Sequence, residues 1–233
     1  NDDVSQRVKS QYEENPYPRW RYINTSVNQK VSIIEGINSE IKPNSISSNV
    51  GDSHLKVLVA GCGTGQQILN TQIYKNARIT AIDLSLASLA YAQRKMNELG
   101  IHNVELIQMD ILEISLLEKK FDIILCSGVL HHMHDPSKGL QSLVDVLNKN
   151  GFLKLGLYSE LARQDVVSVR KYISKNKLQS NKDGIRGFRK TIFSGKAPKI
   201  NSITSRSDFF TLSSCRDLCF HAQEHRFTIK QIQ

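Results

Sequence analysis

The feature that most constrains this fold is a glycine-rich stretch at residues 56–67, which reads KVLVAGCGTGQQ. It begins as an apolar run and then places glycines at alternate positions, Gly61, Gly63 and Gly65. Glycine lets the backbone turn tightly and approach a ligand without an intervening Cβ atom. A helix-compatible stretch follows, and a helix start presents free N–H groups and a positive dipole end. The stretch therefore predicts the front edge of an α/β domain that binds a nucleotide or nucleoside.

Strand-like and helix-like segments alternate on both sides of this turn. We expect strands at 55–60, 78–82, 104–109, 121–126 and 152–157, with Asn150-Gly151 as the turn into the last one. Helices are expected at about 65–74, at 86–99 behind a Ser85 cap, and at 136–147 behind Asp135. Strands that alternate with helices favour right-handed βαβ units and a parallel sheet. The predicted fold class is α/β, with a doubly wound, mainly parallel sheet.

Three segments are expected along the chain. Residues 1–54 form an N-terminal helical and lid segment, with a helix at 4–14 that ends at the Asn-Pro-Tyr-Pro sequence of 15–18. The rigid stretch that carries Arg19 and Trp20 suits either an ordered lid or a surface strap held by one aromatic ring. Residues 55–158 form the α/β core. Residues 159–233 form a helical segment, with helices expected at 161–173, 185–193 and 208–225.

Charge is concentrated in one part of the sequence. The net charge is +9, and residues 160–206 hold twelve Lys or Arg against three acids, so the rest of the chain is neutral. No apolar run approaches the ~20 residues that span a membrane. The polar N-terminus resembles neither a signal peptide nor an anchor, and a chain that starts without Met is expected to be a piece of a longer protein. Four scattered cysteines favour a reducing compartment, so we expect a cytoplasmic protein.

Polar residues follow the predicted strands at the edge where parallel sheets bind ligands. They are the glycine turn, Asp83, Asp110 and the Cys-Ser-Gly sequence that contains Ser127. An acid at the position of Asp83 can accept hydrogen bonds from both ribose hydroxyls, or it can complement the dipole of the next helix. NAD also uses such a turn, but its fingerprint expects glycine where this chain has Gln66.

Four motifs in order now resemble a known family. The sequences AGCGTG, AIDLS, QMDI and FDIILCSGVLHHMHDP at 60–65, 81–85, 108–111 and 121–136 look like the successive motifs of class I S-adenosylmethionine-dependent methyltransferases. The resemblance covers residues 55 to about 158. It implies a Rossmann-like methyltransferase fold whose sheet closes with two further strands. The sequence does not show both of these strands.

The resemblance also implies roles for particular residues. Gly61, Gly63 and Gly65 would line the methionine part of S-adenosylmethionine. Asp83 would hold the ribose, Asp110 and Ile111 would frame the adenine, and Ser127 would face the sulfonium. Cys62, Gln66 and Leu84 beside them are candidates for cofactor contact. Tyr12, Arg19 and Trp20 of the N-terminal segment are further candidates for cofactor contact.

A closer likeness extends beyond the core. The sequence QYEENPYPRW at 11–20 and residues 208–229 look like methyltransferase domains found downstream of tetratricopeptide repeats in bacterial proteins. An upstream repeat domain in the full-length protein is therefore expected.

Histidines after the fourth predicted strand are the candidate general bases. An imidazole of His131 or His132 can take a proton near neutral pH, with His134 behind them, although one histidine can simply pack against the cofactor. The HHxH pattern lacks a Cys or acidic partner at ligand spacing, and the H-x-x-E-H order at 221–225 matches some zinc peptidases only as a short motif. We expect no metal, and we read 221–225 as part of a helix.

The sequence thus predicts methyl transfer from S-adenosylmethionine, with S-adenosylhomocysteine as the product. The acceptor is expected to be a small molecule or a peptide or protein, and an anionic one because of the basic segment. Nucleic acid is a weaker alternative, since aromatic residues are sparse there. Two other readings stay open: a catalytically silent cofactor-binding domain that recognises an anionic partner, and an NAD-type oxidoreductase.

Overall fold

The computed structural model describes residues 3–22, 30–47 and 54–232. The chain divides into two compact units, Asn1–Gly156 and Leu157–Gln233, and each is described by itself. The three segments expected from the sequence stay predictions. Among the described residues, no helix combines the length and the apolar character needed to cross a lipid bilayer.

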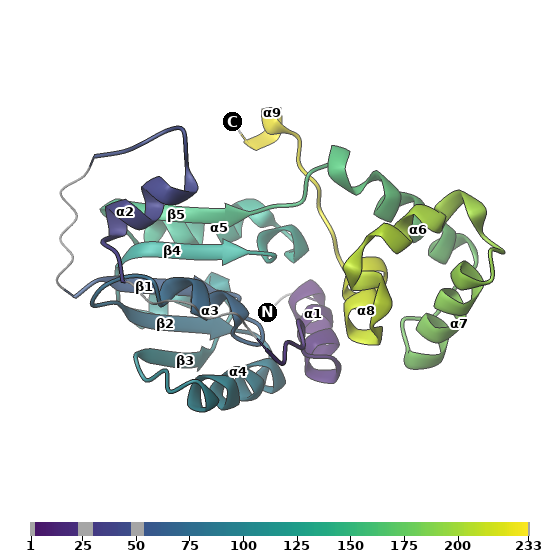
Figure 1. Ribbon diagram of the computed structural model, residues 1–233, viewed down its shortest axis with the longest axis horizontal. Helices are drawn as coiled ribbons and strands as arrows, with labels where there is room; N and C mark the ends of the chain where they lie inside the picture. Colours follow the sequence, from purple (N-terminus) through teal and green to yellow (C-terminus); the bar gives the residue numbers. More distant parts are fainter. Residues whose placement is uncertain (1–2, 23–29, 48–53, 233) are drawn as a thin grey trace. The chain divides into compact units, whose positions relative to one another are not determined.

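The first unit is built on a five-stranded sheet in the order β3-β2-β1-β4-β5 (Figure 1). All four strand pairings are parallel, which confirms the predicted doubly wound α/β class. The strands are β1 at Lys56–Ala60, β2 at Arg78–Asp83, β3 at Val104–Gln108, β4 at Phe121–Ser127 and β5 at Leu147–Gly156. Each of the first four lies within one residue of its predicted bounds.

Helices connect the strands as the alternating pattern requires. They are α1 at Asp3–Glu14, α2 at Ile33–Glu40, α3 at Gln66–Thr71, α4 at Leu86–Glu98 and α5 at Pro136–Asp145, with a 3₁₀ helix at Ile111–Leu117. The side chains of Ser85 and Asp135 accept hydrogen bonds from the first turns of α4 and α5, as predicted. Helix α3 ends at Thr71, three residues before the predicted end.

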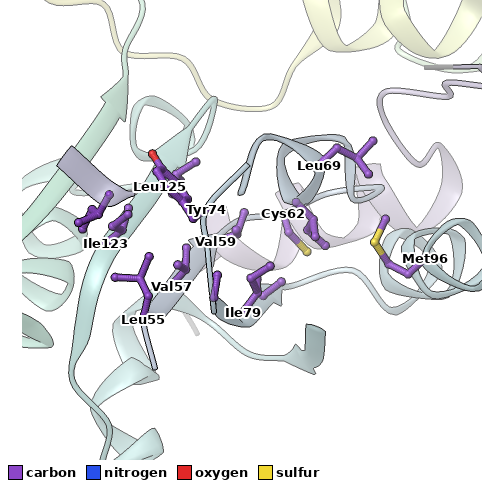
Figure 2. Close-up of a cluster of buried hydrophobic side chains, with 14 of the residues drawn as sticks. Leu55, Val57, Val59, Cys62, Leu69, Tyr74, Ile79, Met96, Ile123 and Leu125 are labelled. Atoms are coloured by element: carbon purple, nitrogen blue, oxygen red, sulfur yellow. The ribbon is translucent and has the colours of Figure 1, made fainter. Parts of the chain in front are cut away.

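One face of the sheet is packed by α2, α3 and α4. Alternate residues of β1, Val57 and Val59, point into a cluster with Leu69 of α3 and Met96 of α4 (Figure 2). The side chains of the strand residues between them, such as Leu58, are also fully buried. Burial on both faces is typical of the central strand of a doubly wound sheet, which is why β1 reads as a continuous apolar run.

Strand β5 differs from its prediction. It begins at Leu147, and the expected Asn150-Gly151 turn lies inside it. Pairing with β4 shifts register here, because Phe121 pairs with Leu147 but Ile123 pairs with Phe152. Extra residues on one strand are accommodated as a bulge, and the Asn148 amide donates to Asp122 at 2.7 Å within it. The Asn150-Gly151 sequence, which was predicted to form a turn, therefore lies in the irregular part of a strand.

The second unit is helical and has its own core. It contains α6 at Gln164–Lys175, α7 at Lys182–Phe193, α8 at Leu212–Phe220 and α9 at Ile229–Ile232, with short 3₁₀ helices between them. Val169, Phe188, Phe209 and Leu218 are among its buried apolar residues. In the described residues after β5, no strand extends the sheet, and an isolated bridge joins Ser159 to Phe227.

The predicted helix at 208–225 is wrong in its last part. Helix α8 ends at Phe220, and residues 221–225 are not helical. Arginine side chains hold this stretch instead, because Arg163 forms a two-pronged contact with Glu224 and Arg170 donates to the His221 carbonyl at 2.9 Å. Side-chain contacts over fifty residues apart in sequence outweighed local helix propensity.

Candidate functional site

The glycine turn between β1 and α3 is packed closely against neighbouring segments. Gly61 and Gly63 have φ of 72° and 51°, which other residues adopt at a steric penalty. A Cβ atom on Gly61 would lie 2.3 Å from a methyl of Val129, and one on Gly63 would lie 2.9 Å from the Tyr17 carbonyl oxygen. The N–H groups of Gly61 and Cys62 both donate to the Ile82 carbonyl, which ties the turn to β2. The glycines therefore let three other segments of the chain approach the turn.

Asp83, at the end of β2, is held by backbone groups alone in the described residues. One carboxylate oxygen accepts from the Gly63 N–H at 2.8 Å and the other from the Ser85 N–H at 2.9 Å. Burial raises the pKa of Asp83, the two N–H groups lower it, and the charge of Glu13 raises it again, with a net rise. A carboxylate has further lone pairs, so Asp83 can still accept hydrogen bonds from two hydroxyls of a ligand.

Asp110, at the end of β3, has one oxygen in use and one unused. Its Oδ1 accepts from the Leu112 N–H at 3.0 Å, which starts the 3₁₀ helix. Its Oδ2 is buried and has no hydrogen-bond partner among the described residues. A buried acceptor without a donor is costly, so this oxygen calls for a ligand that donates a hydrogen bond. Ile111 beside it is buried, and the Leu84 carbonyl accepts from Gln108 at 3.0 Å.

The segment after β4 lies against the glycine turn. The Gln67 amide of α3 donates to the Ser127 carbonyl at 2.6 Å, and Val129 fills the space beside Gly61. His131 and His132 follow on a single 3₁₀ turn and are both buried, with ring centroids 4.3 Å apart. His134 is exposed. The segment that carries the histidines is therefore in direct contact with the glycine turn and α3.

The N-terminal segment is attached to the same edge. Figure 1 shows α1 beyond the arrowheads of the strands, at their carboxyl ends. The Trp20 indole is buried and donates to the Thr64 carbonyl at 3.2 Å, while the Thr64 hydroxyl donates to the Pro18 carbonyl at 2.5 Å. Tyr12 is half-buried and Arg19 is exposed. Trp20 therefore fixes this segment to the glycine turn, as the strap interpretation expects. Whether the segment also acts as a lid stays a prediction.

Most of the predicted site residues come together. The Met109 N–H donates to the Asp83 carbonyl, so the glycine turn, Asp83 and Asp110 form one hydrogen-bonded edge. Two predicted members, Gln66 and Arg19, are exposed. The contact of each of these predicted site residues with a ligand stays a prediction.

Sequence reasoning missed three residues of this edge. They are Glu13, which caps α4, Thr64, which holds the N-terminal segment, and Gln67, which holds the segment after β4. Each acts across more than forty residues of sequence, and no local pattern signals such a contact.

The residues present fit the nucleoside cofactor that the sequence predicts. An adenine amino group would supply the donor that Oδ2 of Asp110 lacks, and ribose hydroxyls would use the remaining lone pairs of Asp83. In contrast, the H-x-x-E-H stretch is occupied by ion pairs, because Glu224 contacts Arg163 at 2.6 Å and Arg226 at 3.3 Å. Within the described part of the chain, no group of three His, Cys, Asp or Glu is arranged to hold a metal ion.

Comparison with known proteins gives the family. A family model described as "Methyltransferase domain" matches residues 51–193. An uncharacterised protein of Synechococcus sp. is 32% identical over 72% of this chain and 43% of its own length. A malonyl-[acyl-carrier protein] O-methyltransferase of Acetivibrio thermocellus is 32% identical over 47% of this chain and 38% of its own. This chain thus spans less than half of either relative.

The fold is also found in solved structures. The structure of PKMT2 from Rickettsia typhi matches 93% of this chain and 43% of that one, with a TM-score of 0.66 and 20% identity. At this identity the likeness shows the fold alone. The tetratricopeptide-repeat association stays a prediction. The chain belongs to the methyltransferase domain family.

Proposed function

We propose that the protein transfers the methyl group of S-adenosylmethionine to an oxygen atom of a small molecule or of a group carried by a protein. One observation carries the proposal: an imidazole pair lies in the segment that packs against the cofactor turn through Val129. A hydroxyl acceptor loses a proton during transfer, so a base beside the turn suits oxygen chemistry. The name of the Acetivibrio thermocellus relative, an O-methyltransferase, is in keeping with this choice.

The bound cofactor supplies a methyl group on a sulfonium, so transfer forms an acceptor–carbon bond, breaks the sulfur–carbon bond and leaves neutral S-adenosylhomocysteine. The chain's own residues position the partners and exclude water. His132 takes the hydroxyl proton in this scheme. His131 packs edge-on against it, with an angle of 72° between the rings, and orients it.

The test is methyl transfer from radiolabelled cofactor to a panel of acceptors: a malonyl thioester, a phenol and a lysine-containing peptide. We expect label on an oxygen acceptor. His132→Ala should lower kcat about 10²-fold or more while it leaves the Kd for S-adenosylhomocysteine nearly unchanged. His134→Ala, at an exposed position two residues before the start of α5, is the matched control and should retain activity.

Other outcomes separate the remaining readings. Full activity in both His131→Ala and His132→Ala would remove the general-base role. Label on the lysine peptide alone would replace oxygen with nitrogen as the acceptor atom. Cofactor binding without transfer to any acceptor would favour a silent binding domain, and hydride transfer with NAD would favour an oxidoreductase.

We further propose that the acceptor, or the partner that carries it, is acidic. Residues 171–199 hold nine Lys or Arg against a single acid, Asp183. Eight of the nine are exposed, and none makes an ion pair with any described carboxylate. By contrast, Arg163, Arg206 and Arg226 around this segment are all paired with carboxylates. An unpaired basic surface raises the association rate of an anionic partner.

This proposal is tested by binding of a poly-glutamate peptide and of single-stranded and double-stranded DNA in a salt titration. We expect peptide binding that weakens with salt and is lost when Lys182, Arg186 and Lys190 are changed to glutamine. The same three changes should leave S-adenosylhomocysteine binding intact. Preferential, salt-sensitive binding of DNA would make nucleic acid the partner, and no salt-sensitive binding of any probe would overturn the proposal.

A further inference from the structure

Glu13, near the end of α1, caps a helix that begins 73 residues later. Its Oε1 accepts from the Leu86 N–H at 2.6 Å and its Oε2 accepts from the Ala87 N–H at 3.1 Å. These are the first two residues of α4, the helix that follows Asp83. A carboxylate at a helix start binds free N–H groups and complements the positive end of the dipole.

The four N–H groups at the start of α4 are fully accounted for by three side chains. Asp83 accepts from Ser85, Glu13 accepts from Leu86 and Ala87, and the Ser85 hydroxyl accepts from Ser88. A helix leaves its first four N–H groups without intrahelical partners, and here three of the four join α4 to Asp83 and α1, while the fourth bonds to the Ser85 cap. The conformation of the Asp83 carboxylate is thus linked to the position of α1.

The same N-terminal segment is held at its other end. The Lys95 ammonium of α4 lies 5.3 Å from the Trp20 ring centre and donates to the Arg21 carbonyl at 3.3 Å, and the Tyr91 hydroxyl donates to the Trp20 carbonyl. Together with the Trp20–Thr64 bond, these contacts attach the segment to α4 and to the glycine turn. Glu13 and Trp20 therefore attach the N-terminal segment at two points, the start of α4 and the glycine turn.

We propose that Glu13 is a positioning residue for the cofactor: it holds the start of α4 and the Asp83 carboxylate in the geometry that binds the ribose, without touching the ligand. Binding of the cofactor and docking of the N-terminal segment then support each other, because linkage between two sites is reciprocal. The inference rests on the cofactor assignment and is independent of the methyl acceptor.

Glu13 also acts through its charge. Two titratable groups face Asp83: Glu13 from α1 and the Cys62 thiol from the glycine turn. Burial, followed by the charge of Asp83, raises the pKa of Cys62 well above its ordinary value, so the thiol stays neutral. Burial is the main cause of the raised pKa of Asp83, and the charge of Glu13 raises this pKa further. Affinity for the ribose is lost as the pH falls through the pKa of Asp83, and removal of the Glu13 charge moves that loss to lower pH.

The experiment is calorimetric titration of S-adenosylhomocysteine into the wild-type chain, Glu13→Gln, Glu13→Ala and the control Glu14→Gln across pH 4 to 8. Glu14 is the exposed neighbour of Glu13. We expect Glu13→Ala to bind about tenfold more weakly or worse, since two hydrogen bonds to a charged group are lost. Glu13→Gln should lose less affinity and shift its acid midpoint to lower pH, and Glu14→Gln should match the wild type.

Hydrogen exchange provides a second readout, and its first part does not require ligand. The amides of Leu86 and Ala87 should exchange faster in Glu13→Ala, and S-adenosylhomocysteine should slow exchange in α1 of the wild type. Wild-type affinity and an unchanged acid midpoint in both Glu13 variants would overturn the inference. Failure of the wild type itself to bind would overturn the cofactor assignment and this inference together, whereas binding without methyl transfer would leave the inference standing.

Discussion

Two carboxylates at the strand ends of the first unit are held in a different way from two carboxylates of the second unit. In residues 1–156, Asp83 and Asp110 accept hydrogen bonds from backbone N–H groups and have no cationic partner among the described residues. In residues 157–233, the Glu224 side chain is fully buried and contacts Arg163 and Arg226, while Asp165 is paired with Arg206. A two-pronged arginine pair uses most of the hydrogen-bonding capacity of a carboxylate. One or two backbone N–H groups leave some of its lone pairs free to accept from a ligand. The difference distinguishes carboxylates that are satisfied within the fold from Asp83 and Asp110, which we propose to contact the cofactor.

The largest expected effect is on the arginine-held side. Glu224→Ala leaves the Arg163 guanidinium buried without its partner, and breaking a buried ion pair costs about 3–5 kcal/mol. Thermal denaturation followed by circular dichroism measures this loss of stability. Glu160→Ala is the matched control, because its pair with Arg226 is 42% exposed on the glutamate side and contributes about 1 kcal/mol or less. Equal effects of the two substitutions would remove the structural role of Glu224.

The next effect is on the backbone-held side. Asp83→Asn should weaken S-adenosylhomocysteine binding about 10²-fold, because an amide cannot accept from Gly63, Ser85 and two ribose hydroxyls together. Calorimetry measures the Kd. Asp165→Asn makes the same chemical change at a carboxylate paired with Arg206, and it should leave the Kd unchanged. Similar losses in both variants would contradict the division between the two units.

A smaller effect is expected at Asp110. Asp110→Asn keeps an oxygen for the Leu112 N–H but presents an amide NH₂ toward the adenine, so we expect about tenfold weaker binding. The variant should also discriminate less between adenosine and inosine analogues of S-adenosylhomocysteine, since the inosine base lacks the amino group. Competition binding with the two analogues checks this, and unchanged discrimination would show that Oδ2 of Asp110 serves another group.

The smallest effect is at an exposed ion pair. Lys119 and Glu105 lie 3.0 Å apart, and both side chains are about half exposed. Lys119→Ala should change stability by about 1 kcal/mol or less and leave cofactor binding as it is. Denaturation and calorimetry on the same sample measure both quantities. A loss of stability as large as that of Glu224→Ala would show that exposure does not determine how much an ion pair of this protein contributes to stability.

Local patterns were sufficient to predict the sheet and the acidic residues at the ends of its strands. The strands through Val59 and Ile124 are short apolar runs, and Asp83 and Asp110 follow directly after strands, so one stretch of sequence carries each signal. Contacts over long separations were not predictable in the same way. Glu13 reads as one of two acids at the end of a polar helix, and its role depends on the placement of α4 in space.

Two errors have the same physical cause. Asn150-Gly151 has the composition of a turn, yet β4 pairs on both sides of it and keeps it in β5. Residues 221–225 have helix-compatible composition, yet arginines from α6 and the preceding turn hold their carbonyl and carboxylate groups. In both places tertiary partners, which no window of sequence contains, decided the backbone conformation.

The most direct test is a crystal structure of this chain with S-adenosylhomocysteine. The account predicts that both ribose hydroxyls donate to Asp83, that the adenine amino group donates to Oδ2 of Asp110, and that Glu13 still caps α4 without touching the ligand. A ligand bound elsewhere, or one that leaves Oδ2 of Asp110 without a donor, would contradict it.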